Sequence, residues 1–211
     1  MSQVLAVTAR RAGRACADIG RPNDPEFGET MKRYILTGTP GCGKTSIVRA
    51  LEFAGYLVVE EAATDIIALR NAQGIAQPWS HAAFIDDITN LQKQRQLRVA
   101  GLESGIQFYD RSPLCTYALS RWLGVPISTI LADEMERIRV EGIYQQQVFF
   151  IENLGFCEPT QARRISFEDS IRFEKVHEET YREFGYECIR VAPQELARRV
   201  EQIERYVLAR D

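Results

Sequence analysis

One short stretch limits the fold of this chain more than any other. Residues 38–45 read GTPGCGKT, in which Gly38 and Gly43 bracket the loop and Lys44 and Thr45 follow it. The stretch comes directly after an apolar run at 34–37 and directly before a helix-period segment at 44–54. Glycines at such a junction allow a tight turn in which the backbone approaches a ligand closely. The spacing therefore predicts a strand, a loop and a helix, the basic unit of an α/β fold.

The residue types in this loop are those that bind a chain of phosphates. Glycines allow successive backbone N–H groups to wrap around a phosphate, and the N-terminus of the following helix adds the positive end of its dipole. Lys44 is expected to span two phosphates, and the Thr45 hydroxyl to ligate Mg²⁺. Cys42 is expected to fill space in the loop, with a redox role as the alternative. The predicted nucleotide-binding set is Gly38, Thr39, Pro40, Gly41, Cys42, Gly43, Lys44, Thr45 and Ser46.

Along the rest of the chain, short apolar runs alternate with longer segments of helical period. Runs such as YLVVE and QVFFI are apolar without strict alternation, which is typical of strands covered on both faces. This pattern predicts an α/β fold with a mostly parallel sheet. Ser166 is expected to be the N-cap of a helix that ends at Phe184, before Gly185. The other expected strands are 56–60, 106–110, 147–151 and 187–191, and the other expected helices are 80–103, 113–123, 127–140 and 194–208.

Charge and hydropathy exclude several classes of partner. The chain has 26 Lys and Arg against 29 Asp and Glu, a net charge of −3, so no global basic field would hold nucleic acid. No apolar run reaches the roughly 18 residues that cross a bilayer, and no secretion signal is recognisable. The 5 cysteines form no CxxC pair, which favours reduced thiols, no structural metal and a cytoplasmic protein.

The first 31 residues differ from the rest of the chain. They carry scattered arginines and a GRPNDPEFGE stretch, with little periodicity before Met31. We expect residues 1–31 to be a flexible N-terminal extension and residues 32–211 to form the domain that carries the chemistry. An upstream start codon ahead of Met31 and an Arg-rich organelle-targeting segment are the alternatives.

Motifs that are missing separate the classes of phosphate-loop protein. The strand at 106–110 ends in Asp110-Arg111, whereas a mechanical ATPase would have Asp-Glu there. The sequence contains neither the Asn-Lys-x-Asp of signalling GTPases nor the LSGGQ-like signature of transporter ATPases. The remaining class is that of small-molecule and nucleotide kinases, with ATP as the donor, GTP as the alternative and Mg²⁺ as the metal.

A kinase of this class needs three further groups, and candidates for each are present. Glu60 and Glu61, at the end of the second strand, are candidates to meet the acceptor hydroxyl, although carboxylates there also suit the first turn of a helix. Asp110 is the candidate metal ligand beside Thr45, and Arg111 is a candidate clamp for a phosphoryl group; a structural ion pair is the alternative. The candidate lid arginines are Arg163, Arg164 and Arg172, the alternative being a solvated basic loop in which Arg172 pairs with Glu168.

Four aromatic and histidine residues carry weaker signals. His81 and His177 flank helices in polar contexts and are expected to be solvated. Trp79 and Trp122 are expected to pack in the core, with a place in an acceptor pocket as the alternative.

With these motifs assembled, residues 32–207 resemble the AAA-domain family of small P-loop ATPases and kinases, which is related to the ribosylnicotinamide kinase domain of bifunctional NAD regulators. The resemblance is carried by 33–67, which includes the loop, by FYDRSPLCTYAL at 108–119 and by 163–191. It implies a three-layer P-loop sandwich with a parallel five-stranded sheet in the order 2-3-1-4-5 and a helical lid. It also implies nucleotide bound at Gly41, Gly43, Lys44 and Thr45. A frequent family pattern is Glu-x-Ala-Arg, whereas here Glu61-Ala62-Ala63 is followed by Thr64.

Together these features predict a Mg²⁺-dependent phosphotransferase that moves the γ-phosphoryl group of ATP to a small-molecule, nucleoside or nucleotide acceptor. A nucleotide-dependent switch, or a slow ATPase that acts on a protein or lipid partner, is the alternative. No nucleic-acid partner and no membrane span are expected. The oligomeric state stays open.

Overall fold

A five-stranded parallel sheet forms the centre of the computed structural model, which describes residues 31–101, 105–155 and 166–209. The strand order is β2-β3-β1-β4-β5, and each neighbouring pair runs parallel, as the resemblance implied. The first strand of the described residues is thus the central one. The strands are β1 (Lys32–Thr37), β2 (Leu57–Val59), β3 (Ile106–Asp110), β4 (Gln147–Ile151) and β5 (Glu187–Val191).

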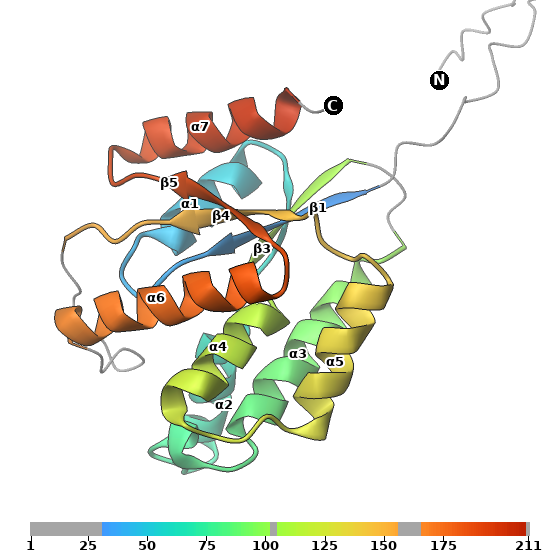
Figure 1. Cartoon of the computed structure of the whole chain (residues 1–211), viewed down its shortest axis with the longest axis vertical. Helices are drawn as coiled ribbons and strands as arrows, with labels where there is room; N and C mark the ends of the chain where they lie inside the picture. Colours follow the sequence, from blue (N-terminus) through green and yellow to red (C-terminus); the bar gives the residue numbers. More distant parts are fainter. Residues whose placement is uncertain (1–30, 102–104, 156–165, 210–211) are drawn as a thin grey trace, which may run out of the picture.

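Helices cover both faces of the sheet (Figure 1). They are α1 (Lys44–Phe53), α2 (Ala63–Ala72), α3 (Phe84–Arg98), α4 (Pro113–Leu123), α5 (Thr129–Val140), α6 (Phe167–Glu183) and α7 (Leu196–Leu208), with a 3₁₀ turn, η1 (Pro78–Ser80). Successive side chains of a strand point to opposite faces. Accordingly, Tyr34 and Leu36 of β1 pack with α1 and α7, while Ile35 packs with α4 and α5. These three layers are those of the predicted sandwich.

The elements with strong apolar patterns begin and end where the sequence predicts. β3, α4, β4 and β5 match the predicted ranges, and Ser166 is the N-cap of α6. The Ser166 Oγ atom accepts a hydrogen bond of 3.0 Å from the Asp169 N–H group. Local apolar periodicity and capping chemistry are therefore sufficient to place these elements.

Two segments differ from the prediction. The predicted helix at 80–103 is shorter, because Pro78 opens a 3₁₀ turn, α3 begins only at Phe84, and α3 ends at Arg98. Helix α2 was not predicted, since Ile66 is its one buried residue and its apolar side chains follow no clear stripe. Helices α2 and α3 lie with α5 in a group of helices at one end of the molecule, beyond the sheet (Figure 1).

Two further predictions concern the chain ends and membranes. Apart from Met31, the predicted N-terminal extension lies outside the described residues. None of the helices in the described ranges is both long and apolar enough to cross a membrane.

Candidate functional site

The glycine loop connects the central strand β1 to α1 in a conformation that glycine alone adopts easily. Gly38 has φ 133° and Gly43 has φ 83°, both in the region that L side chains avoid. A Cβ atom on Gly38 would lie 2.3 Å from the carbonyl oxygen of Ile151, at the end of β4. The first glycine of the motif is therefore needed for the close approach of the loop to the neighbouring strand.

Lys44 folds back into this loop. Its side chain is buried, and its Nζ atom donates to the carbonyl oxygens of Gly38 at 3.0 Å and Thr39 at 3.1 Å. Thr45 and Ser46 follow as exposed residues in the first turn of α1, where backbone N–H groups lack helical partners. The loop thus presents a cation, free N–H donors and a hydroxyl group within one turn, which is the chemistry of a phosphate site.

Asp110 lies at the end of β3, with its carboxylate nearly buried. Its Oδ1 atom is buried and has no hydrogen-bond partner. Burial raises the pKa of Asp110, and the nearby cations of Lys44 and Arg111 oppose this effect. Asp110 and Thr45 line the same cavity, so an orphaned carboxylate oxygen and a hydroxyl group face one space.

These two oxygen ligands fit Mg²⁺, which is usually held by one or two protein oxygens together with substrate phosphates. In the three described ranges, no group of three or more His, Cys, Asp or Glu side chains is placed to hold a metal ion. A magnesium ion at this site would therefore be shared between Thr45, Asp110 and the nucleotide.

Glu61 and Arg111 form a second polar group at the same cavity. The Arg111 Nε atom donates to Glu61 Oε1 at 2.8 Å, and the Thr64 hydroxyl donates to Glu61 Oε2 at 2.6 Å. Burial alone would raise the pKa of Glu61, but Arg111, Thr64 and Lys44 together hold that pKa below its ordinary value. Glu61 is therefore a carboxylate at neutral pH.

His177 closes this group from α6. Its Nε2 atom lies 3.4 Å from Arg111 Nη1, and its Nδ1 atom lies 3.0 Å from the carbonyl oxygen of Phe173. Because a guanidinium only donates, Nε2 is the acceptor and Nδ1 carries the proton. Burial, with the charges of Arg111 and Lys44, lowers the pKa of His177 to about 3. His177 is thus a neutral acceptor that helps to orient Arg111.

The backbone of Arg111 also has an unusual conformation. Its φ angle is 73°. Among the described residues other than glycine, Arg111 is the one with a positive φ. Such a conformation costs on the order of 1–3 kcal/mol and persists where the surroundings enforce it. Here the Arg111 N–H group donates to the carbonyl oxygen of Leu36 at 3.0 Å, so the turn after β3 is tied to the central strand. This turn directs the guanidinium toward Glu61.

A cavity of about 290 Å³ joins these groups. Lys44, Thr45, Glu61, Asp110 and Arg111 line the end nearest the loop. The remaining wall is mostly apolar and comes from α2, η1, α3, α4 and α6, together with Pro40 of the loop. That wall consists of Pro40, Ala63, Thr64, Ile67, Trp79, Phe84, Ile88, Gln92, Cys115, Thr116, Leu119, Trp122, Leu123, Phe173 and His177.

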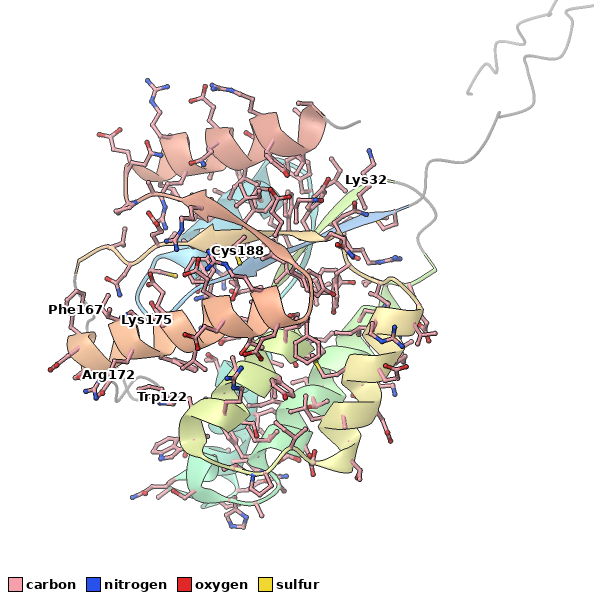
Figure 2. All side chains as sticks on the ribbon, in the orientation of Figure 1. Lys32, Trp122, Phe167, Arg172, Lys175 and Cys188 are labelled. Carbon is pink, nitrogen blue, oxygen red and sulfur yellow. The ribbon has the colours of Figure 1, made fainter. Side chains whose placement is uncertain are left out.

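Both tryptophans therefore line the cavity, as in the alternative that the sequence left open, and Trp79 also packs against a buried cluster, as expected. The Trp122 ring lies 5.2 Å from the Phe173 ring, between centroids, so α4 and α6 meet at this wall (Figure 2). The neutral pair Thr116 and Gln92 adds polarity, with the Thr116 hydroxyl donating to the Gln92 amide oxygen at 2.8 Å.

Two other predicted site residues, Glu60 and Arg172, do not line the cavity. The Glu60 side chain is 62% exposed and lies 4.0 Å from Arg49, whereas its neighbour Glu61 faces the site. The Arg172 side chain is 62% exposed and forms an ion pair with Asp169 at 2.7 Å. The partner considered from the sequence was the neighbouring residue, Glu168. In Figure 2, Arg172 projects from the N-terminal half of α6. Arg163 and Arg164 lie outside the described residues.

The prediction for His177 was wrong. The sequence pattern suggested a solvated histidine, but its side chain is fully buried, while His81 is exposed as predicted. Phe173, His177 and Tyr181 follow one another at intervals of four residues and share the buried face of α6. That spacing was the available signal, since a histidine in register with two aromatic residues lies on their stripe.

Comparison with known proteins agrees with this geometry. A family model described as "AAA domain" matches residues 33–199. No curated protein matches the chain. Among solved structures, the chain is similar to deoxyadenosine kinase from M. mycoides with bound dATP, at 14% identity and a TM-score of 0.53, over 83% of this chain and 98% of that one.

A second similar structure is NadR in complex with NAD and AMP-PNP, at 18% identity and a TM-score of 0.59. The match covers 82% of this chain and 48% of NadR. At these identities the two solved structures show a shared fold. Because the family model spans the loop, the Asp110-Arg111 turn and the helices of the cavity, the chain belongs to this AAA-domain family.

Proposed function

We propose that this protein is a Mg²⁺-dependent phosphotransferase that transfers the γ-phosphoryl group of ATP to a hydroxyl group of a small acceptor. The observation that carries this proposal is that the phosphate loop opens into a cavity of about 290 Å³. Lys44 and Thr45 line one end of that cavity, next to a carboxylate and an arginine from the segments that follow β2 and β3. A donor and an acceptor bound in this space would have their reacting groups side by side.

On the donor side, the loop residues bind the triphosphate. Lys44 exchanges its bonds to the carbonyl oxygens of Gly38 and Thr39 for bonds to phosphate oxygens, and the N-terminus of α1 supplies N–H donors. Mg²⁺, held by Thr45 and Asp110 together with the nucleotide, would neutralise charge on the phosphates. The role of Arg163 and Arg164, which are predicted to approach the γ-phosphoryl group, remains a prediction from the sequence.

On the acceptor side, Glu61 receives the hydroxyl group. Its low pKa keeps it ionised at neutral pH, so it orients the hydroxyl and takes its proton as the phosphoryl group is transferred. Arg111 holds Glu61 through Nε, and the Nη1 atom of Arg111 contacts His177 Nε2. The three side chains thus form a supported base rather than an isolated carboxylate.

The far wall of the cavity favours an acceptor with a flat, uncharged ring, such as a nucleoside. Among the described lining residues, Lys44 and Arg111 are the two cations, and both lie at the loop end. Thr64, which stands where the frequent family pattern has arginine, donates its hydroxyl to Glu61 and adds no charge. Aromatic side chains such as Trp122 offer stacking surface, while nothing described there would neutralise a second phosphate.

The test is binding followed by turnover. The unfolding temperature of the protein is measured with Mg²⁺ and ATP, GTP or their hydrolysis-resistant analogues, alone and with a panel of nucleosides, nucleotides and small hydroxylated metabolites. Ligands that bind the folded state raise this temperature by mass action. A second rise from one acceptor, and phosphorylation of that acceptor by ATP, is the expected result. A nucleotide shift to which no acceptor adds would overturn the kinase assignment in favour of a nucleotide switch.

A further inference from the structure

A buried arginine from α7, which is not among the residues that line the cavity, contacts the phosphate loop. Arg199 is the fourth residue of α7 and is only 3% exposed. Its Nη2 atom donates to the carbonyl oxygen of Cys42 at 2.8 Å. Its guanidinium also fills the space beside Gly43, where a Cβ atom would lie 2.9 Å from Nη1. Arg199 therefore meets the loop at the two residues directly before Lys44.

Among the described residues, no carboxylate pairs with the charge of Arg199. The Cys42 carbonyl is the one hydrogen-bond partner that those residues give to its guanidinium group, and its Nε atom is buried without any partner. An unpaired buried guanidinium is unfavourable in a protein interior. A nearby anion would compensate it, and the phosphate loop is the place in this fold where an anion would bind.

The bond to Cys42 also sets the direction of the next peptide group. The described peptide bonds contain no cis bond, and in a trans peptide the carbonyl and the N–H group point in opposite directions. Because the Cys42 carbonyl points to Arg199, the Gly43 N–H group points away from α7. The next residue in the chain is Lys44, whose ammonium group donates to the carbonyl groups of Gly38 and Thr39.

We propose that Arg199 is a positioning residue for the donor phosphates. It holds the peptide between Cys42 and Gly43 in the orientation that presents an N–H donor, and it adds a second buried positive charge beneath the loop. Arg199 acts through the loop and does not itself touch the phosphates. The proposal rests on the proposed nucleotide binding and adds a residue from α7 to it.

The experiment compares R199M with R198M. Arg198 is the neighbouring residue, 69% exposed and paired with Glu201 at 3.0 Å, so it offers a matched control. Binding of Mg²⁺ and a hydrolysis-resistant ATP analogue is measured by calorimetry on protein shown to be folded by its unfolding temperature. Loss of a bond from a charged donor should weaken binding about 10- to 100-fold in R199M. R198M should bind like the wild type, and R199K, which keeps a charge and a donor, should recover part of the loss.

A chemical rescue keeps the test decisive if R199M does not fold. In R199A, millimolar methylguanidinium should restore analogue binding, and the same concentration of methylammonium should restore less. If R199M or R199A binds the analogue as tightly as the wild type, the positioning role is wrong while the proposed function stands. If the wild type itself binds no nucleotide, both proposals fail.

Discussion

The two halves of the site are built in different ways. Apart from Asp110 of β3, the proposed donor half is one continuous stretch, residues 38–46, whose buried lysine donates to carbonyl groups of the same loop. The acceptor half is assembled from five segments, and its key contacts join Glu61 to Arg111 across 50 residues and Arg111 to His177 across 66. A phosphate chain is the same in every donor, so a local motif suffices to bind it. An acceptor is recognised by its shape, which requires walls from several elements.

The largest expected effect tests the donor half. K44A removes the buried ammonium, so affinity for Mg²⁺ and an ATP analogue should fall at least about 100-fold, since charge-assisted bonds to phosphate are the strong ones. Turnover should be lost as well. K175A, at an exposed lysine on α6, should bind normally in the same calorimetric titration. Retained turnover in K44A would mean that the loop is not the donor site.

The next effect separates the two adjacent carboxylates. E61Q keeps the size of the side chain but removes the base, so the rate of acceptor phosphorylation should fall about 100-fold or more while affinity for the ATP analogue changes little. E60Q should keep the wild-type rate, because Glu60 is exposed and outside the cavity. Steady-state phosphorylation of the identified acceptor measures both. Equal rates in E61Q and the wild type would exclude Glu61 as the base.

A third experiment asks how firmly the acceptor half is held together. In the folded protein, burial lowers the pKa of His177 to about 3, so the ring is neutral above that pH. In the unfolded chain, His177 takes up a proton near its ordinary pKa of 6.5. The unfolded state therefore binds more protons between these values, and stability should fall as the pH falls through that window. The contribution is about 1.4 kcal/mol for each pH unit.

The matched variants are H177Q and H81Q. Denaturant unfolding at pH 6.5 and pH 5 should show a smaller loss of stability in H177Q than in the wild type, while H81Q should follow the wild type because His81 is exposed. Arg111 and Lys44, which come from other elements, are the charges that oppose protonation of His177. Identical pH dependence in all three proteins would contradict the buried contact.

The smallest expected effect probes the far wall. W122A removes an aromatic face from the cavity and should raise the KM for the acceptor about 10-fold, with the KM for ATP unchanged. F53A deletes a side chain that is 96% exposed at the end of α1 and should leave both constants unchanged. If W122A instead raised the KM for ATP alone, the assignment of the far wall to the acceptor would be wrong, and that wall would bind the donor.

The difference between a donor half built from a local motif and an acceptor half built from distant segments also explains how much could be predicted from the sequence. The loop, the parallel sheet, the pair Glu60-Glu61 and Asp110-Arg111 follow from local patterns, because strand ends and a glycine motif determine what lies at one edge of the sheet. The cavity wall, α2 and the bond from Arg199 to Cys42 follow from packing between distant segments, which no local pattern contains. His177 lies between these cases, since its stripe on α6 was visible but its partner Arg111 was not.

The central position of β1 has a consequence for how the protein is made. β1 leaves the ribosome before all the other described strands, yet its two neighbours in the sheet are β3 and β4, and β4 ends at Ile151. A chain is synthesised from its N-terminus, so the glycine loop exists for much of translation without the strands that flank it. The close approach of Gly38 to the Ile151 carbonyl can form only after β4 has emerged. The hydrogen bond from Arg199 to the Cys42 carbonyl can form only after α7 has emerged. The ability to hold a nucleotide is therefore acquired only after β4 and α7 have been synthesised.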